Sequence, residues 1–307
     1  MHKTVLSTAD VARLFNVTET TVKRWADEGM LRCQKTPGGH RRFPVRLVIE
    51  FAEQNRFEPG GVLEFPTNDA INSKTEMATL ARDFGTLTQI FVDRALSANR
   101  NDLFLFLSFL YEHCFQLWEI HDLILRPGMA EIGERWSNGD IGIGHEHRAS
   151  YETLDALARL QAEIMVKPPV GKVALFASIG EELHEIGLRC ASYIFESEGW
   201  TTQYLGAAVP TEAVIESIND AKPAVVCLSF TRREQVQDSL QALDEVAAAA
   251  RGVGAMLITG GRSAEELHTF RSLFDGVFTS SHQVQAFIEH IQPQGSEAPC
   301  KELRQDS

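Results

Sequence analysis

The stretch Glu182-Leu183-His184-Glu185-Ile186-Gly187 is the sequence signal from which the fold can be inferred. It follows an apolar run, Lys172–Phe176, that is typical of a buried strand. Two further apolar runs end in comparable segments. Ser229-Phe230-Thr231 closes the second, and Gly260-Gly261 follows the third. The carboxyl ends of parallel strands meet at one edge of a sheet, and open α/β proteins bind their ligands there. We therefore expect the three segments to form one binding site.

His184 has the neighbours that a metal-binding histidine needs. A neutral imidazole can bind a metal through one nitrogen while the other donates a hydrogen bond to a carboxylate, for which Glu182 is the candidate. Gly187, Gly260 and Gly261 would let the backbone approach a bulky ligand closely. The simpler alternative is a loop histidine beside ordinary turn glycines. Agreement between three separate segments favours the ligand site.

The spacing of these segments carries a family resemblance. Forty-one residues separate Gly187 from Ser229, and twenty-eight separate Thr231 from Gly260. This pattern resembles the signature of cobalamin-binding domains, Asp/Glu-x-His-x-x-Gly followed by Ser-x-Leu/Thr and Gly-Gly. The resemblance implies that His184 is the lower axial ligand of cobalt. It also implies that the other motif residues surround the cofactor: Glu182, Gly187, Ser229, Thr231, Gly260 and Gly261.

Strand and helix patterns alternate through residues 169–292. Such alternation predicts a parallel, doubly wound α/β domain of the flavodoxin-like (Rossmann-type) kind. We expect strands at residues 172–178, 201–205, 224–230, 255–259 and 276–279, and helices at 188–198, 211–221, 234–251 and up to 291. Residues 293–307 are polar, and we expect them to form a disordered tail.

The amino-terminal residues 1–57 predict a winged helix-turn-helix. Ser7-x-x-Asp10 has the form of a capping box, and Thr18 is placed to cap a second helix that ends near Gly29. In such a unit the second helix enters the major groove of double-stranded DNA. The residues expected to face the bases are Thr20, Thr21, Lys23 and Arg24.

Two short strands around the turn at residues 36–39 predict a basic wing, followed by a third helix that starts near Pro44. Five cations and no acid lie between Arg32 and Arg46. The wing residues expected to bind phosphate are Lys35, His40, Arg41 and Arg42. This arrangement resembles the DNA-binding domain of MerR-type regulators, which implies an operator-DNA partner. The alternative is a small basic module that binds protein.

Charge divides unevenly along the chain. Residues 1–60 contain ten Lys and Arg against seven Asp and Glu, for +3, and the net charge of −13 therefore leaves −16 on the remainder. A basic module on an acidic body is the arrangement that this asymmetry indicates. Residues 58–73 have linker composition where standard MerR proteins continue into a long dimerisation helix. We therefore expect later residues to form a homo-oligomer, a dimer or a tetramer.

Residues 74–168 predict a four-helix bundle, with helical spacing at 77–96, 102–117, 121–136 and 146–165. Pro127 is expected to kink or restart the third helix. Nine residues separate Trp136 from Glu146-His147. This Trp-x9-Glu-His motif resembles that of the CarH/LitR group of light-responsive cobalamin repressors.

That resemblance implies that the bundle caps the upper face of adenosylcobalamin. Trp136 would cover the adenosyl group, and Glu146 would accept hydrogen bonds from its hydroxyls. The chain departs from the group at Ser137, where light-sensing relatives place a histidine that can bind cobalt. The alternatives are core packing for Trp136 and a surface or capping role for His147.

Cysteine usage and hydropathy limit the protein class. The five cysteines are scattered and form no Cys-x-x-Cys pair, so a disulfide framework and a zinc site are not expected. No apolar run has the length that crosses a membrane, and no signal peptide opens the chain. We expect a cytoplasmic protein.

Three functions fit these observations. The first is a cobalamin-dependent, light-responsive repressor that binds operator DNA as an oligomer and is not an enzyme. The second is a corrinoid methyl-carrier or mutase subunit, which would not need a DNA-binding arm. The third is a DNA-binding protein with a vestigial cofactor domain, against which the intact His184 motif argues. We favour the repressor.

Overall fold

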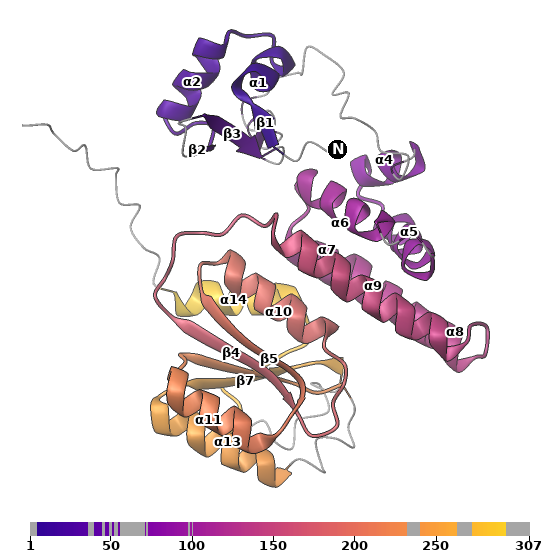
Figure 1. The fold of residues 1–307 in the computed structure, drawn as a ribbon, viewed down its shortest axis with the longest axis vertical. Helices are drawn as coiled ribbons and strands as arrows, with labels where there is room; N and C mark the ends of the chain where they lie inside the picture. The colour runs from indigo at the N-terminus through magenta and orange to yellow at the C-terminus, as the bar shows by residue number, and fades with distance from the viewer. Residues whose placement is uncertain are drawn as a thin grey trace, which may run out of the picture. The chain divides into compact units, whose positions relative to one another are not determined.

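The computed structural model describes residues 5–35, 40–44, 47–48, 51, 55, 71, 73–97, 99, 101–231, 240–262 and 272–292. The chain divides into two compact units, Met1–Glu163 and Ile164–Ser307 (Figure 1). The predicted turn at 36–39, most of the predicted linker and the tail at 293–307 lie outside the described residues. Within the described part, no helix is long and apolar enough to span a bilayer.

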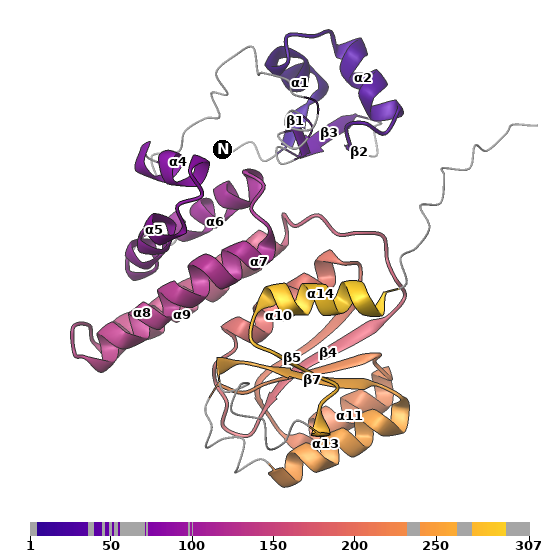
Figure 2. The same cartoon turned by 180° about the vertical axis from the view of Figure 1, so that it is seen from behind.

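The second unit contains a five-stranded parallel sheet of order β5-β4-β6-β7-β8. Its strands are β4 (Val173–Ile179), β5 (Thr201–Val209), β6 (Val225–Ser229), β7 (Met256–Gly260) and β8 (Gly276–Phe278). Helices α10 (Ile186–Ser197) and α14 (Ser281–Ile291) cover one face, and α11 (Thr211–Ala221) and α13 (Leu240–Val253) cover the other (Figure 2). This confirms the doubly wound α/β prediction. The start of the predicted helix at 234–251 lies outside the described residues.

Side chains that alternate along β4 pack against the helices on both faces of this sheet. Leu175, Ala177 and Ile179 are buried in one core cluster with residues of α11 and α13. Phe176, on the opposite face, packs edge to face with Phe195 of α10, with ring centroids 5.4 Å apart. Because side chains alternate along a strand, one apolar run can serve two cores.

Strand β5 is longer than the sequence predicts and irregular. It continues to Val209, while its pairing with β4 shifts register after Phe176 and again after Ala177. Gly206 and Ala208 have φ angles of +96° and +50°. The predicted strand ended at Leu205 because the next three residues, Gly206-Ala207-Ala208, lack the β-branched side chains that are common in strands.

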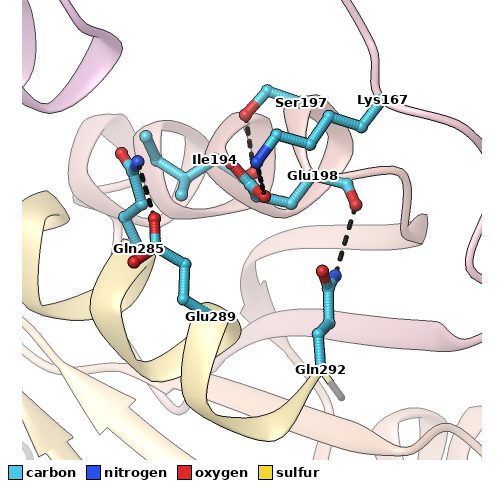
Figure 3. A network of polar contacts seen from close by, with 7 residues as sticks. All are labelled: Lys167, Ile194, Ser197, Glu198, Gln285, Glu289 and Gln292. Carbon is cyan, nitrogen blue, oxygen red and sulfur yellow. Dashed lines mark hydrogen bonds and ion pairs between the residues drawn. The ribbon is translucent and has the colours of Figure 1, made fainter. Parts of the chain in front are cut away.

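The segment that enters β4 is fixed to the carboxyl end of α10, to which the end of α14 is also bound (Figure 3). The Lys167 amide donates to the Ser197 carbonyl at 2.9 Å, and its ammonium lies 2.5 Å from the Glu198 carboxylate. Gln292, just after α14, donates to the Glu198 carbonyl at 3.2 Å. At Gly199, where φ is +86°, a Cβ would lie 2.3 Å from the carbonyl oxygen of Pro168, so only glycine fits.

The helical part of the first unit consists of α4 (Ser73–Leu80), α5 (Phe84–Leu96), α6 (Asp102–Glu112), α7 (Leu117–Ile120), the π-helix η1 (His121–Leu125), α8 (Arg126–Ser137) and α9 (Ile143–Gln161). The predicted helix at 77–96 is interrupted. Arg82 has a φ of +48°, and Asp83 caps α5 by accepting from the Thr86 amide at 3.1 Å. The sequence did not reveal this break because apolar spacing continues across it.

At Pro127 one helical segment follows another without a gap. This proline lies in the first turn of α8, directly after the π-helical turn. Proline has no amide hydrogen, so it cannot donate to the carbonyl of Leu123 four residues earlier. The hydroxyl of Thr88 in α5 donates to that carbonyl instead, at 3.1 Å.

The amino-terminal module contains β1 (Val5–Ser7), α1 (Thr8–Leu14), α2 (Glu19–Asp27), β2 (Gln34–Lys35) and β3 (Arg41–Pro44), with strand order β1-β3-β2. The predicted caps are present, since Ser7 forms a capping box with Asp10 and Thr18 accepts from the Thr21 amide. Strand β1 was not predicted. Three aromatic rings, Phe15, Trp25 and Phe51, form the centre of the core.

Candidate functional site

The loop between β4 and α10 presents His184 at the carboxyl edge of the sheet. Its side chain is 63% exposed, and Nδ1 lies 2.6 Å from Oε1 of Glu182. The same carboxylate oxygen accepts from the His184 backbone amide at 2.9 Å. Donation from Nδ1 places the imidazole lone pair on Nε2, the nitrogen available for a metal.

Glu182 is fully buried beneath this exposed histidine. Its second oxygen, Oε2, accepts from the Thr231 backbone amide at 2.5 Å, and its carbonyl accepts from the Ala208 amide at 3.0 Å. Burial acts to raise the pKa of Glu182. The hydrogen bonds from the His184 side chain and amide and from the Thr231 amide outweigh it, so the pKa is lowered from its ordinary value of 4.5. The carboxylate is therefore charged and holds the imidazole in one orientation.

The three predicted glycines have different reasons to be glycine. Among the described residues outside its own helical turn, no atom would lie within 4 Å of a Cβ at Gly187, in the first turn of α10. A Cβ at Gly260 would lie 2.9 Å from the Phe278 carbonyl oxygen, and one at Gly261 only 2.0 Å from that of Phe230. Gly261 also has a φ of +114°. Backbone packing accounts for Gly260 and Gly261, whereas Gly187 leaves space for a ligand.

Beside Gly187 there is a cavity of about 100 Å³ at the ends of β6, β7 and β8. Ser229 and Thr259 are buried in its wall, and the Thr259 hydroxyl makes no hydrogen bond with any described residue. A buried hydroxyl without a partner is costly, so a ligand with a polar group would stabilise this wall. Burial raises the pKa of Cys227, which also lines the cavity, to about 12, so it remains a thiol. Sequence reasoning missed Thr259, although it directly precedes the Gly-Gly pair.

The residues of the Trp-x9-Glu-His motif lie on α8 and α9 of the first unit. Trp136 is 46% exposed, which disfavours the core-packing alternative. Glu146 accepts from the Ser150 hydroxyl at 2.9 Å and lies 2.6 Å from Nδ1 of His147. The hydroxyl of Ser137 donates to the carbonyl of Glu134 in its own helix, at 2.8 Å.

The predicted base-reading residues lie on α2. Thr20, Lys23 and Arg24 are exposed. Thr21 is half-buried, and its hydroxyl lies 3.0 Å from that of Thr18, so it belongs to the helix cap. Val22 and Trp25, on the opposite face of the helix, are buried in the core.

The predicted wing residues differ from one another in their surroundings. His40 and Arg42 are exposed. Arg41 is turned toward α2, where its Nη2 lies 2.5 Å from Oδ1 of Asp27. Lys35 is the last residue of β2, and its side chain lies outside the described part.

Family comparisons match three parts of the chain. Residues 172–284 match a B12 binding domain, residues 110–161 match a second model described as a B12 binding domain, and residues 5–56 match a helix-turn-helix domain. The first match contains the whole His184 site. The second contains Trp136, Glu146 and His147.

Two curated relatives come from Myxococcus xanthus. The HTH-type transcriptional repressor CarH is 29% identical over 119 residues, which are 38% of this chain and 38% of that protein. The HTH-type transcriptional repressor CarA is 28% identical over 145 residues, 47% of this chain and 48% of that protein. The matches therefore span less than half the length of either relative.

Among solved structures, a monomethylamine corrinoid protein from Methanosarcina barkeri shares the fold, with a TM-score of 0.57 at 14% identity over 68% of this chain and 99% of that one. The chain therefore joins a region that matches a helix-turn-helix domain to two regions that match B12 binding domains, and part of it is similar to the repressors CarH and CarA.

Proposed function

We propose that this chain is a transcriptional repressor that binds operator DNA through its winged helix-turn-helix and uses adenosylcobalamin as a light-sensitive ligand. The observation that carries the proposal is the oriented pair of His184 and Glu182, built into the same chain as a DNA-binding module. The relatives CarH and CarA are repressors, which supports the regulatory role.

The residues of the second unit fit a corrinoid. His184 would bind cobalt through Nε2, while Glu182 fixes its ring through Nδ1. The open space at Gly187 and the hydroxyls of Ser229 and Thr259 would receive the nucleotide tail. When bound, cobalamin would supply a cobalt ion for His184 and, in its adenosyl form, a cobalt–carbon bond that light can break. A vestigial site would have no need of a buried, charged Glu182.

Trp136 and Glu146 would recognise the adenosyl group. A half-exposed indole offers a large apolar face of the kind that stacks on a nucleoside. Glu146, held by Ser150, is a suitable acceptor for ribose hydroxyls. His147 orients the same carboxylate from the other side.

Assembly would connect the cofactor to repression. A single winged module has a small contact surface and would bind DNA weakly. Joining several modules in a homo-oligomer raises the overall DNA affinity by roughly 10²–10⁴-fold. In the dark the chain would assemble with adenosylcobalamin and occupy its operator. In the light it would lose its adenosyl contacts at Trp136 and Glu146, come apart and leave the DNA.

Light scattering on the full chain tests this proposal directly. Apo protein, protein with adenosylcobalamin in the dark, and the same sample after green light should differ in mass, with the largest species in the dark. Methylcobalamin, which lacks the adenosyl group, is the matched control and should not produce that species. An unchanged mass in every sample, or tighter DNA binding after illumination, would refute the mechanism. The absorption spectrum of the dark sample separately reports whether cobalamin is bound at all.

A corrinoid carrier is the alternative function. The resemblance to the Methanosarcina corrinoid protein concerns the fold alone, and the helix-turn-helix match favours a regulator that is not an enzyme. DNA binding by the purified chain would decide between the two.

A further inference from the structure

The exposed face of α2 carries an acid where DNA phosphates would approach. Thr20, Lys23, Arg24 and Asp27 follow one another at helical spacing, and all four are exposed. Asp27 is 59% exposed at the last residue of the helix. A bare carboxylate on this face would repel the DNA backbone.

Arg41 in β3 neutralises this acid. Its Nη2 lies 2.5 Å from Oδ1 of Asp27, and its side chain is only 18% exposed. The neighbouring Phe43 is fully buried and anchors the same face of β3 to the core. Because side chains alternate along a strand, Arg42 points to the other face and is exposed.

We propose that Arg41 is a positioning residue, which fixes the wing against the recognition helix through Asp27, and that Arg42 is the wing cation that reaches phosphate. The inference rests on the proposed DNA binding and replaces the expectation that both arginines bind phosphate. The strand pairing supports it, because Arg42 lies opposite Gln34 and Ser7, which are uncharged, and no described acid pairs with it.

The two roles differ in what happens to Asp27. If Arg41 turned to a phosphate, the carboxylate of Asp27 would be left bare beside the DNA and would cancel much of the gain. If the pair stays closed, the wing keeps one angle to α2. The preference of the protein for one DNA sequence over another then depends on the Arg41–Asp27 ion pair. The number of DNA phosphates that the protein neutralises does not depend on this pair.

The experiment measures binding of the full chain, loaded with adenosylcobalamin and kept in the dark, to two duplexes by fluorescence anisotropy over a range of salt concentrations. One duplex is selected by the wild-type chain from a random library, and the other is a scrambled duplex of the same length. The variants are the double substitution Asp27→Ala/Arg41→Ala, the charge exchange Asp27→Arg/Arg41→Asp, and Arg42→Ala as matched control. Circular dichroism verifies that each variant is folded.

Arg42→Ala should weaken binding to both duplexes alike and reduce the salt slope by about 1. The double alanine variant should keep the wild-type salt slope but lose preference for the selected duplex by about 3- to 5-fold, the coupling expected of a partly exposed ion pair. The charge exchange should recover part of that preference.

A double variant whose salt slope falls by about 1 with unchanged preference would show Arg41 to be a phosphate contact and would overturn the inference. Unchanged slope and unchanged preference would overturn it as well. If the wild-type chain selects no duplex, the proposed DNA binding itself fails and the inference fails with it, which is a different result from either of these.

Discussion

Replacing Glu182 by glutamine tests the site at its most buried point. The substitution keeps the shape of the side chain but removes its charge and turns one acceptor into a donor. The carboxylate now accepts three hydrogen bonds, from His184 Nδ1 at 2.6 Å, from the His184 amide at 2.9 Å and from the Thr231 amide at 2.5 Å. The amide oxygen can serve the two His184 donors, which leaves its NH₂ group facing the Thr231 N–H.

The magnitude follows from this loss. Hydrogen bonds to a charged group contribute about 1.5–3 kcal/mol, and a buried amide left without an acceptor costs about 1–3 kcal/mol. We expect Glu182→Gln to lower the free energy of unfolding by about 2–3 kcal/mol, because partial relaxation offsets part of the sum. Loss of the orienting carboxylate should also weaken cobalamin binding by about 10- to 100-fold.

The pH dependence supplies an independent check. The folded-state pKa of Glu182 lies below its ordinary value of 4.5, so its charge stabilises the fold fully above that value. The contribution is lost as pH falls through the lower, folded-state pKa. The difference in unfolding free energy between the wild type and Glu182→Gln should therefore be constant near neutral pH and shrink below about pH 4.5.

Urea unfolding of the apo chain at several pH values measures the stability term, and absorption titration with cobalamin measures affinity. Glu181→Gln, at the exposed neighbouring carboxylate, is the matched control and should change neither by much. If Glu182→Gln had wild-type stability and affinity, or if its deficit did not depend on acid pH, the role given to the buried carboxylate would be wrong.

Four further substitutions separate ligand binding from folding. His184→Ala should change the absorption of bound cobalamin and reduce its affinity with little effect on stability, since the side chain is 63% exposed; a wild-type spectrum would contradict this. Gly261→Ala should destabilise the fold by more than about 1–3 kcal/mol, because Gly261 has a positive φ and its Cβ would clash with the Phe230 carbonyl oxygen. Gly187→Ala should instead stabilise the apo chain by about 0.5–1 kcal/mol, because alanine is favoured over glycine in a helix. Urea unfolding of the two variants compares these effects. Trp136→Ala should leave unfolding nearly unchanged but reduce the preference for adenosylcobalamin over methylcobalamin, measured by titration in the dark.

The sheet and the histidine loop could be predicted because their signals are local. Strand β4 is an uninterrupted apolar run, and the loop from Glu182 to Gly187 follows it closely in the sequence. The contact between Glu182 and His184 joins residues only two positions apart, so the sequence already brought them together. The same reason explains the correctly predicted caps at Ser7 and Thr18.

What the sequence could not predict depends on partners far along the chain. Nothing local indicates that Arg41 rather than Arg42 turns toward α2, because the choice is made by Asp27, fourteen residues earlier. At Pro127, the carbonyl of Leu123 accepts a hydrogen bond from the hydroxyl of Thr88, which lies thirty-five residues earlier in the chain. Likewise Thr259 becomes notable only once the fold leaves its hydroxyl buried without a described partner.

The two sites are built from separate sets of contacts, and this constrains how one can affect the other. The described contacts that orient His184 come from Glu182, Thr231 and Ala208, all within Ile164–Ser307. The pair that orients the wing, Arg41 and Asp27, lies within the amino-terminal module. These two sets of described contacts share no residue. We expect Glu182→Gln to leave DNA binding of the apo chain unchanged and to weaken it only when adenosylcobalamin is present, because the cofactor would act through assembly. Anisotropy measurements with and without cofactor check this, and a loss of DNA binding in the apo variant would show that the sites communicate by another route.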